Sequence, residues 1–422
     1  MKRLLPATLL TSMLLTGCGM APGLLGGGAS SFELDGTKGS ARSAADWTVF
    51  VYVAADNNLS RFATKDLQEM QAGLTSSRVR FVAMVDQAQQ GDSRIVEIST
   101  PADGTPAVQM VVDDRGAVIP ASREVDSGSP ETLKKFVEWG TANYPSRRSM
   151  FVIWNHGGGA FADPSHLKSF CWDDVTDSHL NLVDLWRVAQ SVSNRTKFDI
   201  MGFDVCLLGH IETAYQLSRV SDFLVSSEKT EPGDGWEYGS LAQVLSKKPT
   251  IYPREFAAEI VKSYGNYYNR RGSNGTLSAI DLEKLKSRVV PAVNDLGKDL
   301  LANSGNAAVR ASLVNDFKQA LMHSASGNGE AAAIDLGYTA QLLTQDATLP
   351  ASTRTLAGKV SQEFQRSVVA NVTTGRTSNQ VYQGLKVYFD LTQVNPNYTD
   401  PSKQFFGTTS WAQFVQAFAP KI

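Results

Sequence analysis

Residues 47–55 read WTVFVYVAA, an unbroken apolar run of the kind found in strands buried on both faces. The following residues repeat apolar side chains at helical spacing, from Leu59 through Leu67 to Leu74. We therefore expect a strand followed by a helix. Further strands are expected at 79–85, 150–154, 198–205 and 223–226, with helices opening after Ser129 and Asn181 as N-caps and another over Leu208 to Tyr215.

This alternation predicts a three-layer α/β/α sandwich with a mostly parallel sheet. Such sheets bind ligands at the carboxyl ends of their strands. Beyond residue 282 the pattern is mainly helical, with a late strand near 384–389 (GLKVYF) that either rejoins the sheet or serves an accessory region. We expect a core over 46–282 and a helix-rich C-terminal region over 283–422.

The composition excludes several classes of protein. With 422 residues and 42% hydrophobic content, the chain has enough apolar material for a large globular body. Forty Lys and Arg against 42 Asp and Glu give a net charge of -2, so no basic field points to nucleic acid. Three cysteines are too few for a disulfide framework or a cysteine-rich zinc site.

The N-terminus reads MKRLLPATLLTSMLLTGC, two basic residues followed by an apolar run too short to span a bilayer comfortably. Its end, Leu15-Thr16-Gly17-Cys18, resembles the lipobox of bacterial lipoproteins. The resemblance implies a signal peptide over 1–17, lipidation of Cys18, and a location in the cell envelope, with the outer membrane or cell surface favoured over the inner membrane. The alternative is a secretory signal with an incidental cysteine. Residues 18–45 are rich in Gly, Ser and Ala and indicate a flexible tether.

Reactive side chains follow two of the expected strands. His156 precedes three glycines in WNHGGG, and Cys206 ends the stretch DIMGFDVC. A thiolate attacks a carbonyl, and an imidazole generates that thiolate and protonates the leaving amine. The N–H groups of Gly157 and Cys206 could bind the developing oxyanion. Taken alone, Cys206 is as easily a small buried hydrophobe, but its spacing of about 50 residues from His156 recurs in caspase-like peptidases.

The sequence resembles the clostripain family, C11-type cysteine peptidases of the caspase-like clan. The matching stretches are ADNNL at 55–59, WNHGGG at 154–159, GFDVCL at 202–207 and EPGDGW at 231–236. The resemblance implies a caspase-like fold and an endopeptidase in which Cys206 is the nucleophile, His156 the general acid/base and Gly157 an oxyanion donor. Val205 departs from the small alanine usual in the clan and affects the expected shape of the pocket.

Family members cleave after arginine or lysine. The residues of this sequence give an independent reason to expect the same preference. Asp204 and Cys206 are two positions apart on the expected strand, so they share a face about 7 Å apart. A carboxylate beside the nucleophile favours a cationic substrate side chain. Asp234 matches the family's second pocket acid. The alternatives are a structural role for Asp204 and a turn-forming role for Asp234.

A polar loop between the catalytic strands carries weaker signals. Lys168 is a candidate for self-cleavage, since relatives can be processed here, although it could also be an ordinary surface lysine. No cofactor is required for the chemistry. The family is often calcium-stimulated, which makes Asp173, Asp174 and Asp177 weak candidates for a calcium site. Cys171 has no adjacent histidine comparable to His156, and we expect it to be a free thiol without a catalytic role.

The leading interpretation is a lipid-anchored cysteine endopeptidase that acts on proteins or peptides with Arg or Lys at the cleavage position, through a Cys/His dyad and a thioester. A second interpretation is a catalytically idle envelope lipoprotein that binds basic peptide segments. A third is a metal-dependent hydrolase, which would lose activity to chelators and survive Cys206→Ala.

Overall fold

The structure is a computed structural model. It describes residues 43–101, 104–113, 116–119, 123–159, 169–324, 332–377, 379–391, 394–395, 398 and 409–418. Within this part of the chain, no helix has the length and apolar character needed to cross a membrane.

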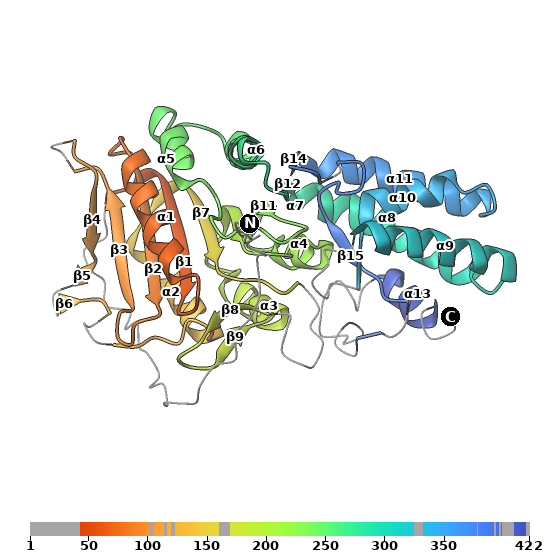
Figure 1. Ribbon diagram of the computed structural model, residues 1–422, viewed down its shortest axis with the longest axis horizontal. Helices are drawn as coiled ribbons and strands as arrows, with labels where there is room; N and C mark the ends of the chain where they lie inside the picture. The colour runs from red at the N-terminus through yellow and green to blue at the C-terminus, as the bar shows by residue number, and fades with distance from the viewer. Residues whose placement is uncertain are drawn as a thin grey trace, which may run out of the picture.

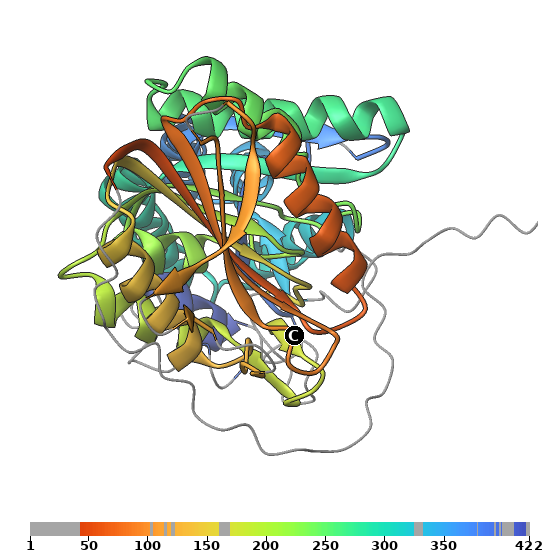
Figure 2. The same ribbon diagram turned by 90° about the vertical axis from the view of Figure 1, so that its left-hand side faces the viewer.

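A nine-stranded sheet forms the centre of the molecule, in the order β14-β12-β11-β10-β7-β1-β2-β3-β4 (Figures 1 and 2). Its middle strands β2, β1, β7, β10 and β11 run parallel, and antiparallel strands extend it on both sides. These strands are β1 (Ala45–Ala55), β2 (Val79–Gln87), β3 (Arg94–Ser99), β4 (Ala107–Met110), β7 (Ser146–Trp154), β10 (Phe198–Asp204), β11 (Ser221–Ser226), β12 (Gly275–Asp281) and β14 (Val368–Thr374).

Helices cover both faces of this sheet, as Figure 2 shows for α1 and α2 on opposite sides. They are α1 (Ser60–Gly73), α2 (Pro130–Asn143), α3 (Leu182–Val192), α4 (Ile211–Leu217), α5 (Tyr238–Lys247), α6 (Pro253–Arg271), α7 (Leu282–Lys284), α8 (Val290–Asn303), α9 (Ala307–Ser324), α10 (Leu336–Gln345), α11 (Ala351–Ser367) and α13 (Ser410–Phe418). A π-helical turn (Leu285–Val289) joins α7 to α8. The predicted α/β/α sandwich is confirmed.

The alternation of side chains along β1 divides the core in two. Val49, Val51 and Val53 pack with α1, α5 and α6, whereas Phe50 and Tyr52 pack on the opposite face with α2 and α3. Both sets are buried because period-2 alternation places successive side chains on opposite faces of a strand. This explains why the strand is apolar at every position.

The predicted helix starts are confirmed with one difference in capping. Asn181 forms a capping box with Asp184, whose backbone N–H and side chain both take part. Ser129 occupies the N-cap position of α2, but its side chain makes no capping hydrogen bond. Pro130 at the first helical position therefore marks this start better than the serine does.

The C-terminal region is mainly helical, as predicted, and α8 to α11 lie at the end of the molecule opposite β4 (Figure 1). The late strand β15 (Lys386–Tyr388) pairs with β13 (Ala333–Asp335) in a separate small sheet. It is the unpredicted β14 that joins the main sheet, antiparallel to β12. Two further small pairs are β5 (Val112–Asp113) with β6 (Gly116–Ala117), and β8 (Phe170–Asp173) with β9 (Ser178–Leu180).

Candidate active site

The carboxyl ends of β7 and β10 bring His156 and Cys206 to the same edge of the sheet. The strands are neighbours and parallel, with Trp154 paired to Asp204. Just beyond them, the backbone N–H of Asn155 donates to Asp204 O at 3.3 Å. His156 and Cys206 both line one cavity of about 600 Å³. The structure therefore places both residues at neighbouring strand ends, in the lining of one cavity.

Asp204 and Asp234 line the same cavity. The remaining lining includes Asn58 from the β1–α1 loop, Glu231 from the loop after β11, and Arg271 from the end of α6. Cavities with convergent charged groups at this edge of an α/β sheet are the usual sites of ligand binding. The four side chains thus belong to a single site.

Cys206 lies in a tight turn rather than on the strand, because β10 ends at Asp204. The next residue, Leu207, has a φ of 63°, which is the left-handed region that non-glycine residues seldom adopt. The Leu207 N–H donates to Lys229 O at 3.0 Å, which holds this turn against the β11 loop. The same loop donates the Glu231 N–H to Cys206 Sγ at 3.2 Å. A donor on sulfur stabilises a thiolate.

His156 contacts Asn58 from the β1–α1 loop, with 2.5 Å between Nε2 and Oδ1. An amide oxygen can only accept a hydrogen bond, so this contact assigns the proton to Nε2. In the neutral ring of this tautomer, Nδ1 carries the lone pair and is the basic nitrogen. Asn58 thereby selects the tautomer and the orientation of the ring.

Gly157 packs directly against the turn that carries the thiol. A Cβ atom placed on Gly157 would lie 2.2 Å from Cys206 O and 2.4 Å from the Val205 side chain. Gly157 pairs with Phe170 in an isolated bridge, in which Gly158 N–H donates to Ser169 O at 2.9 Å. The glycine is thus required for close approach of the two segments, and Val205 fills the space beside it.

Asp204 is a buried carboxylate with 5% of its surface exposed. Its Oδ2 accepts hydrogen bonds from Trp236 N–H at 3.1 Å and from Tyr238 Oη at 3.0 Å. Burial raises its pKa to about 6, against the effect of these two donors. Gly235, with a φ of 61°, passes so close that its Cβ would lie 2.8 Å from Oδ2. The EPGDGW loop therefore folds around Asp204.

Asp234 lies at the more open part of the cavity, with 37% of its side chain exposed. Its carboxylate already has two partners: Lys65 Nζ on α1 at 3.2 Å and the Tyr267 hydroxyl on α6 at 3.1 Å. Asp234 was predicted from the sequence, whereas its partner Lys65 was not. Lys65 and Asp234 are far apart in the sequence, so no local sequence pattern indicates that they form an ion pair.

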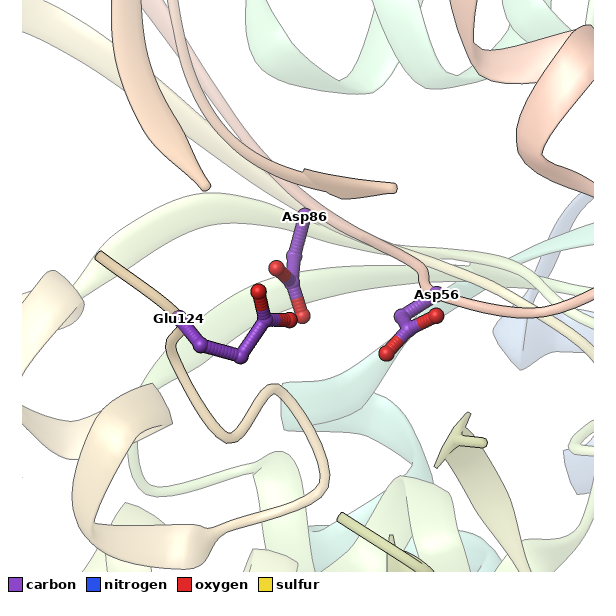
Figure 3. A group of neighbouring side chains, drawn as sticks. All are labelled: Asp56, Asp86 and Glu124. Carbon is purple, nitrogen blue, oxygen red and sulfur yellow. The ribbon is translucent and has the colours of Figure 1, made fainter. Parts of the chain in front are cut away.

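The three acids predicted as weak calcium candidates, Asp173, Asp174 and Asp177, lie in different surroundings. Asp173 is buried and accepts hydrogen bonds from Ser127 and Thr176. Asp174 N–H donates to Asp56 O, and Asp177 has a φ of 52° in a turn. Elsewhere in the described residues, one oxygen from each of Asp56, Asp86 and Glu124 lies within 4.8 Å of the other two (Figure 3).

Cys18 and Lys168 lie outside the described residues. Cys171 is a fully buried free thiol, and burial raises its pKa, which keeps it in the unreactive thiol form.

Comparison with known proteins agrees with this geometry. The model of the clostripain family of C11 peptidases matches residues 51–417. Clostripain of Hathewaya histolytica is 26% identical over 221 residues, which cover 46% of this chain and 41% of that protein. The chain thus spans less than half the length of this curated relative.

Two solved structures share the fold. A secreted C11 cysteine protease from Bacteroides thetaiotaomicron, bound to an irreversible peptide inhibitor, superposes with a TM-score of 0.63 at 18% identity, covering 88% of this chain and 99% of that one. An inactive zymogen C11 protease from Parabacteroides distasonis gives 0.62 at 19% identity, covering 89% and 99%. Since the family model spans most of the sequence, from the first strand of the sheet to the last helix, the chain belongs to the clostripain family.

Proposed function

We propose that the chain is a cysteine endopeptidase that cleaves peptide bonds after arginine or lysine. The observation that carries the proposal is a single cavity lined by the Cys206 thiol, the His156 imidazole and two carboxylates, Asp204 and Asp234. Membership of a peptidase family supports the reaction class. The name of the curated relative, clostripain, supports the preference for basic residues that its family implies.

In the proposed reaction, His156 Nδ1 takes the proton of the Cys206 thiol. The resulting thiolate attacks the scissile carbonyl carbon, and the carbonyl oxygen takes up the negative charge. Backbone N–H groups of Gly157 and Cys206 stabilise that oxygen. His156 gives a proton from Nδ1 to the leaving amine, which departs as the C–N bond breaks and a thioester remains. Water, deprotonated by the same nitrogen, then attacks the thioester and releases the acid product and the thiol.

The two carboxylates account for the proposed preference. Asp204 at the buried wall would accept the guanidinium or ammonium group of the substrate, and its neutralisation would remove a charge that otherwise opposes thiolate formation. Asp234 at the open side would hold further donors of an arginine. Gly235 leaves room for this approach because no Cβ stands in front of Asp204.

The test compares four peptides that differ only in Arg, Lys, Ala or Asp before the scissile bond, with wild-type protein and Cys206→Ala. We expect cleavage of the Arg and Lys peptides alone and its loss in the variant. Binding of Arg peptides without turnover by the wild type would instead indicate the idle binding protein. Activity that survives Cys206→Ala but not a chelator would indicate a metal-dependent hydrolase.

We also propose that the enzyme is anchored to the bacterial envelope through a lipid on Cys18. The lipobox-like LTGC supports this, and the similar protease of Bacteroides thetaiotaomicron is described as secreted. Several acyl chains on one residue give stable anchoring. Cys18→Ala should move the protein from the membrane fraction to the soluble fraction and abolish fatty-acid labelling.

We further propose that the enzyme activates itself by cleavage after Lys168. The similar Parabacteroides distasonis structure is described as an inactive zymogen, which supports processing within this family. Mass spectrometry should find a cut after Lys168 in the wild type and none there in Cys206→Ala or Lys168→Ala. An uncut wild-type chain with full activity would overturn this proposal.

A further inference from the structure

Besides its acids, the catalytic cavity is lined by two arginines, Arg61 at the start of α1 and Arg271 at the end of α6. Both residues are exposed. The proposed reaction gives neither of them a role. Positive charge at the open side of a cavity that receives a substrate cation repels that cation, so the two arginines require a separate explanation.

The two arginines come from the helices that hold Asp234. The Asp234 carboxylate contacts Lys65 on α1 and Tyr267 on α6. Arg61 precedes Lys65 by four residues, and Arg271 follows Tyr267 by four. Residues four apart on a helix lie on the same face, one turn apart. Each helix therefore places an arginine one turn away from its contact with Asp234.

Each guanidinium group lies over an aromatic ring. The Cζ atom of Arg271 is 3.5 Å from the centroid of the Tyr267 ring, and its Nη1 donates to Tyr267 O at 3.3 Å. The Cζ atom of Arg61 is 4.7 Å from the centroid of the Phe62 ring. A planar guanidinium over a ring keeps N–H donors available at its edge, in the fork that matches a carboxylate.

The two rings are themselves fixed against the EPGDGW loop. A Cβ atom placed on Gly233 would lie 3.3 Å from Phe62 Cζ, so this ring packs on the loop. Tyr267 contacts Tyr268 edge-on, with 4.9 Å between the ring centroids, and Tyr268 Oη donates to Gly235 O at 2.5 Å. Because the rings are held in place, a ligand of the arginines pays less to order them.

Neither guanidinium forms an ion pair with an aspartate or glutamate in the part of the chain that the structure describes. Lys65, on the same face of α1 as Arg61, is by contrast paired with both Glu69 and Asp234. The two arginines therefore have donors left for a carboxylate that enters with the substrate.

The order of the strands relates each arginine to one side of the scissile bond. β7 and β1 lie on one side of β10, and β11 and β12 lie on the other. His156 follows β7 and protonates the leaving amine in the proposed reaction, so substrate residues after the scissile bond extend towards β1 and Arg61. Residues before the bond extend towards β12, which follows Arg271 in the chain.

We propose that Arg271 and Arg61 bind acidic side chains of the substrate on either side of the cleaved basic residue. The inference rests on the proposed cleavage after arginine or lysine and narrows its substrate class. Residues two apart in an extended peptide project from the same face, about 7 Å apart. Arg271 therefore meets Asp or Glu two positions before the basic residue, and Arg61 meets Asp or Glu two positions after it. Each substrate charge then meets a group of opposite sign.

Binding is measured on the full chain carrying Cys206→Ala, so that no turnover is needed. The ligands are fluorescent peptides with Arg at the cleavage position and Glu, Gln or Lys two positions before or two positions after it. At each position we expect Glu to give a Kd roughly three- to tenfold lower than Gln, and Lys to give a higher Kd than Gln. High salt should reduce both differences. Equal Kd values for the three peptides, or no binding of any, overturns the subsites.

Each arginine serves as the control for the other. Arg271→Gln should abolish the preference for Glu before the basic residue and keep the preference after it, and Arg61→Gln should do the reverse. Arg270→Gln removes an exposed charge next to Arg271 but outside the lining of the cavity, and should keep both preferences. Preferences that persist in both lining variants, or that are lost in the opposite pattern, contradict the assignment.

Active protein separates these subsites from the proposed function. With the same peptides, kcat/KM should follow the order of the affinities, and kcat should change less because the acidic side chains are held away from the scissile bond. Cleavage after Arg with equal kcat/KM for the Glu, Gln and Lys peptides would overturn the subsites alone. Tighter binding of the Glu peptides without any cleavage would overturn the proposed function and leave the subsites standing.

Discussion

Lys65 on α1 forms an ion pair with Asp234, with 3.2 Å between Nζ and Oδ1. The Tyr267 hydroxyl donates to the other oxygen of the same carboxylate at 3.1 Å. A substrate cation entering the cavity would thus meet a carboxylate that already has a resident cation. The ion pair reduces the attraction of Asp234 for arginine, and Asp204 provides the less compensated charge.

Replacing Lys65 should therefore improve the binding of basic substrates. We expect Lys65→Met to lower KM for Arg peptides roughly two- to fivefold, the scale of a partly exposed ion pair. Steady-state kinetics with Arg and Ala peptides would show the change for Arg only. Lys298→Met, on the remote helix α8, serves as the control for a general loss of positive charge. An increase in KM would contradict this account of the pair.

Asp204 should make the preference for arginine dependent on pH. Its pKa of about 6 means that the free enzyme loses this negative charge as the pH falls through 6. The ratio of kcat/KM for Arg to that for Ala peptides should then fall below pH 6, which separates Asp204 from the ionisation of the thiol and imidazole. In Asp204→Asn the ratio should be low and independent of pH. A ratio constant to pH 5 in the wild type would show that Asp204 does not bind the cation.

Asn58 should matter for turnover more than for binding. Asn58→Ala removes the acceptor that fixes His156 Nε2, and we expect kcat to fall about ten- to a hundredfold through misorientation. Asn58→Asp keeps an oxygen acceptor at this position, so much of kcat should return. Equal kcat in Asn58→Ala and wild type would show that Asn58 does not orient His156 for turnover.

Asp66 should reduce stability at high pH. It is 2% exposed, its Oδ2 accepts Trp154 Nε1–H at 2.8 Å, and burial raises its pKa to about 9. Between its unfolded pKa of about 4 and this value, the folded state binds a proton that the unfolded state has lost, so the free energy of unfolding falls as the pH rises. Asp66→Asn keeps the acceptor without the charge. Urea unfolding should show similar stability near pH 4 and a variant that becomes more stable than the wild type as the pH rises to 8.

Much of the fold could be predicted because local sequence patterns determine many of its helices and strands. The apolar run of β1 and the capping box at Asn181 act over a few residues, and both produced the expected elements. β14 could not be found in this way, because its sequence, VVANVTT, is half-exposed at a sheet edge and pairs with a strand about a hundred residues earlier. Partner choice at an edge depends on tertiary packing rather than on periodicity.

The candidate catalytic residues could likewise be predicted from local patterns, whereas the contacts that support them could not. His156 and Cys206 stand out since each follows an apolar strand, and parallel strands bring such positions together. Their supporting contacts do not stand out, because Asn58 and the backbone of Glu231 come from loops whose approach depends on the whole fold. The group of Asp56, Asp86 and the partly buried Glu124 was missed for the same reason, because Glu124 follows no strand or motif that would connect it with Asp56.

Since β14 completes the sheet beside β12, the core strands cannot be fully covered until the chain has been made past Thr374. Any shortened product, whether from a premature stop or from proteolysis before residue 368, would expose the hydrogen-bonding groups of β12. Exposed strand edges recruit other strands. Loss of the C-terminus would thus yield aggregates rather than a smaller working enzyme, even though the proposed catalytic pair lies far upstream.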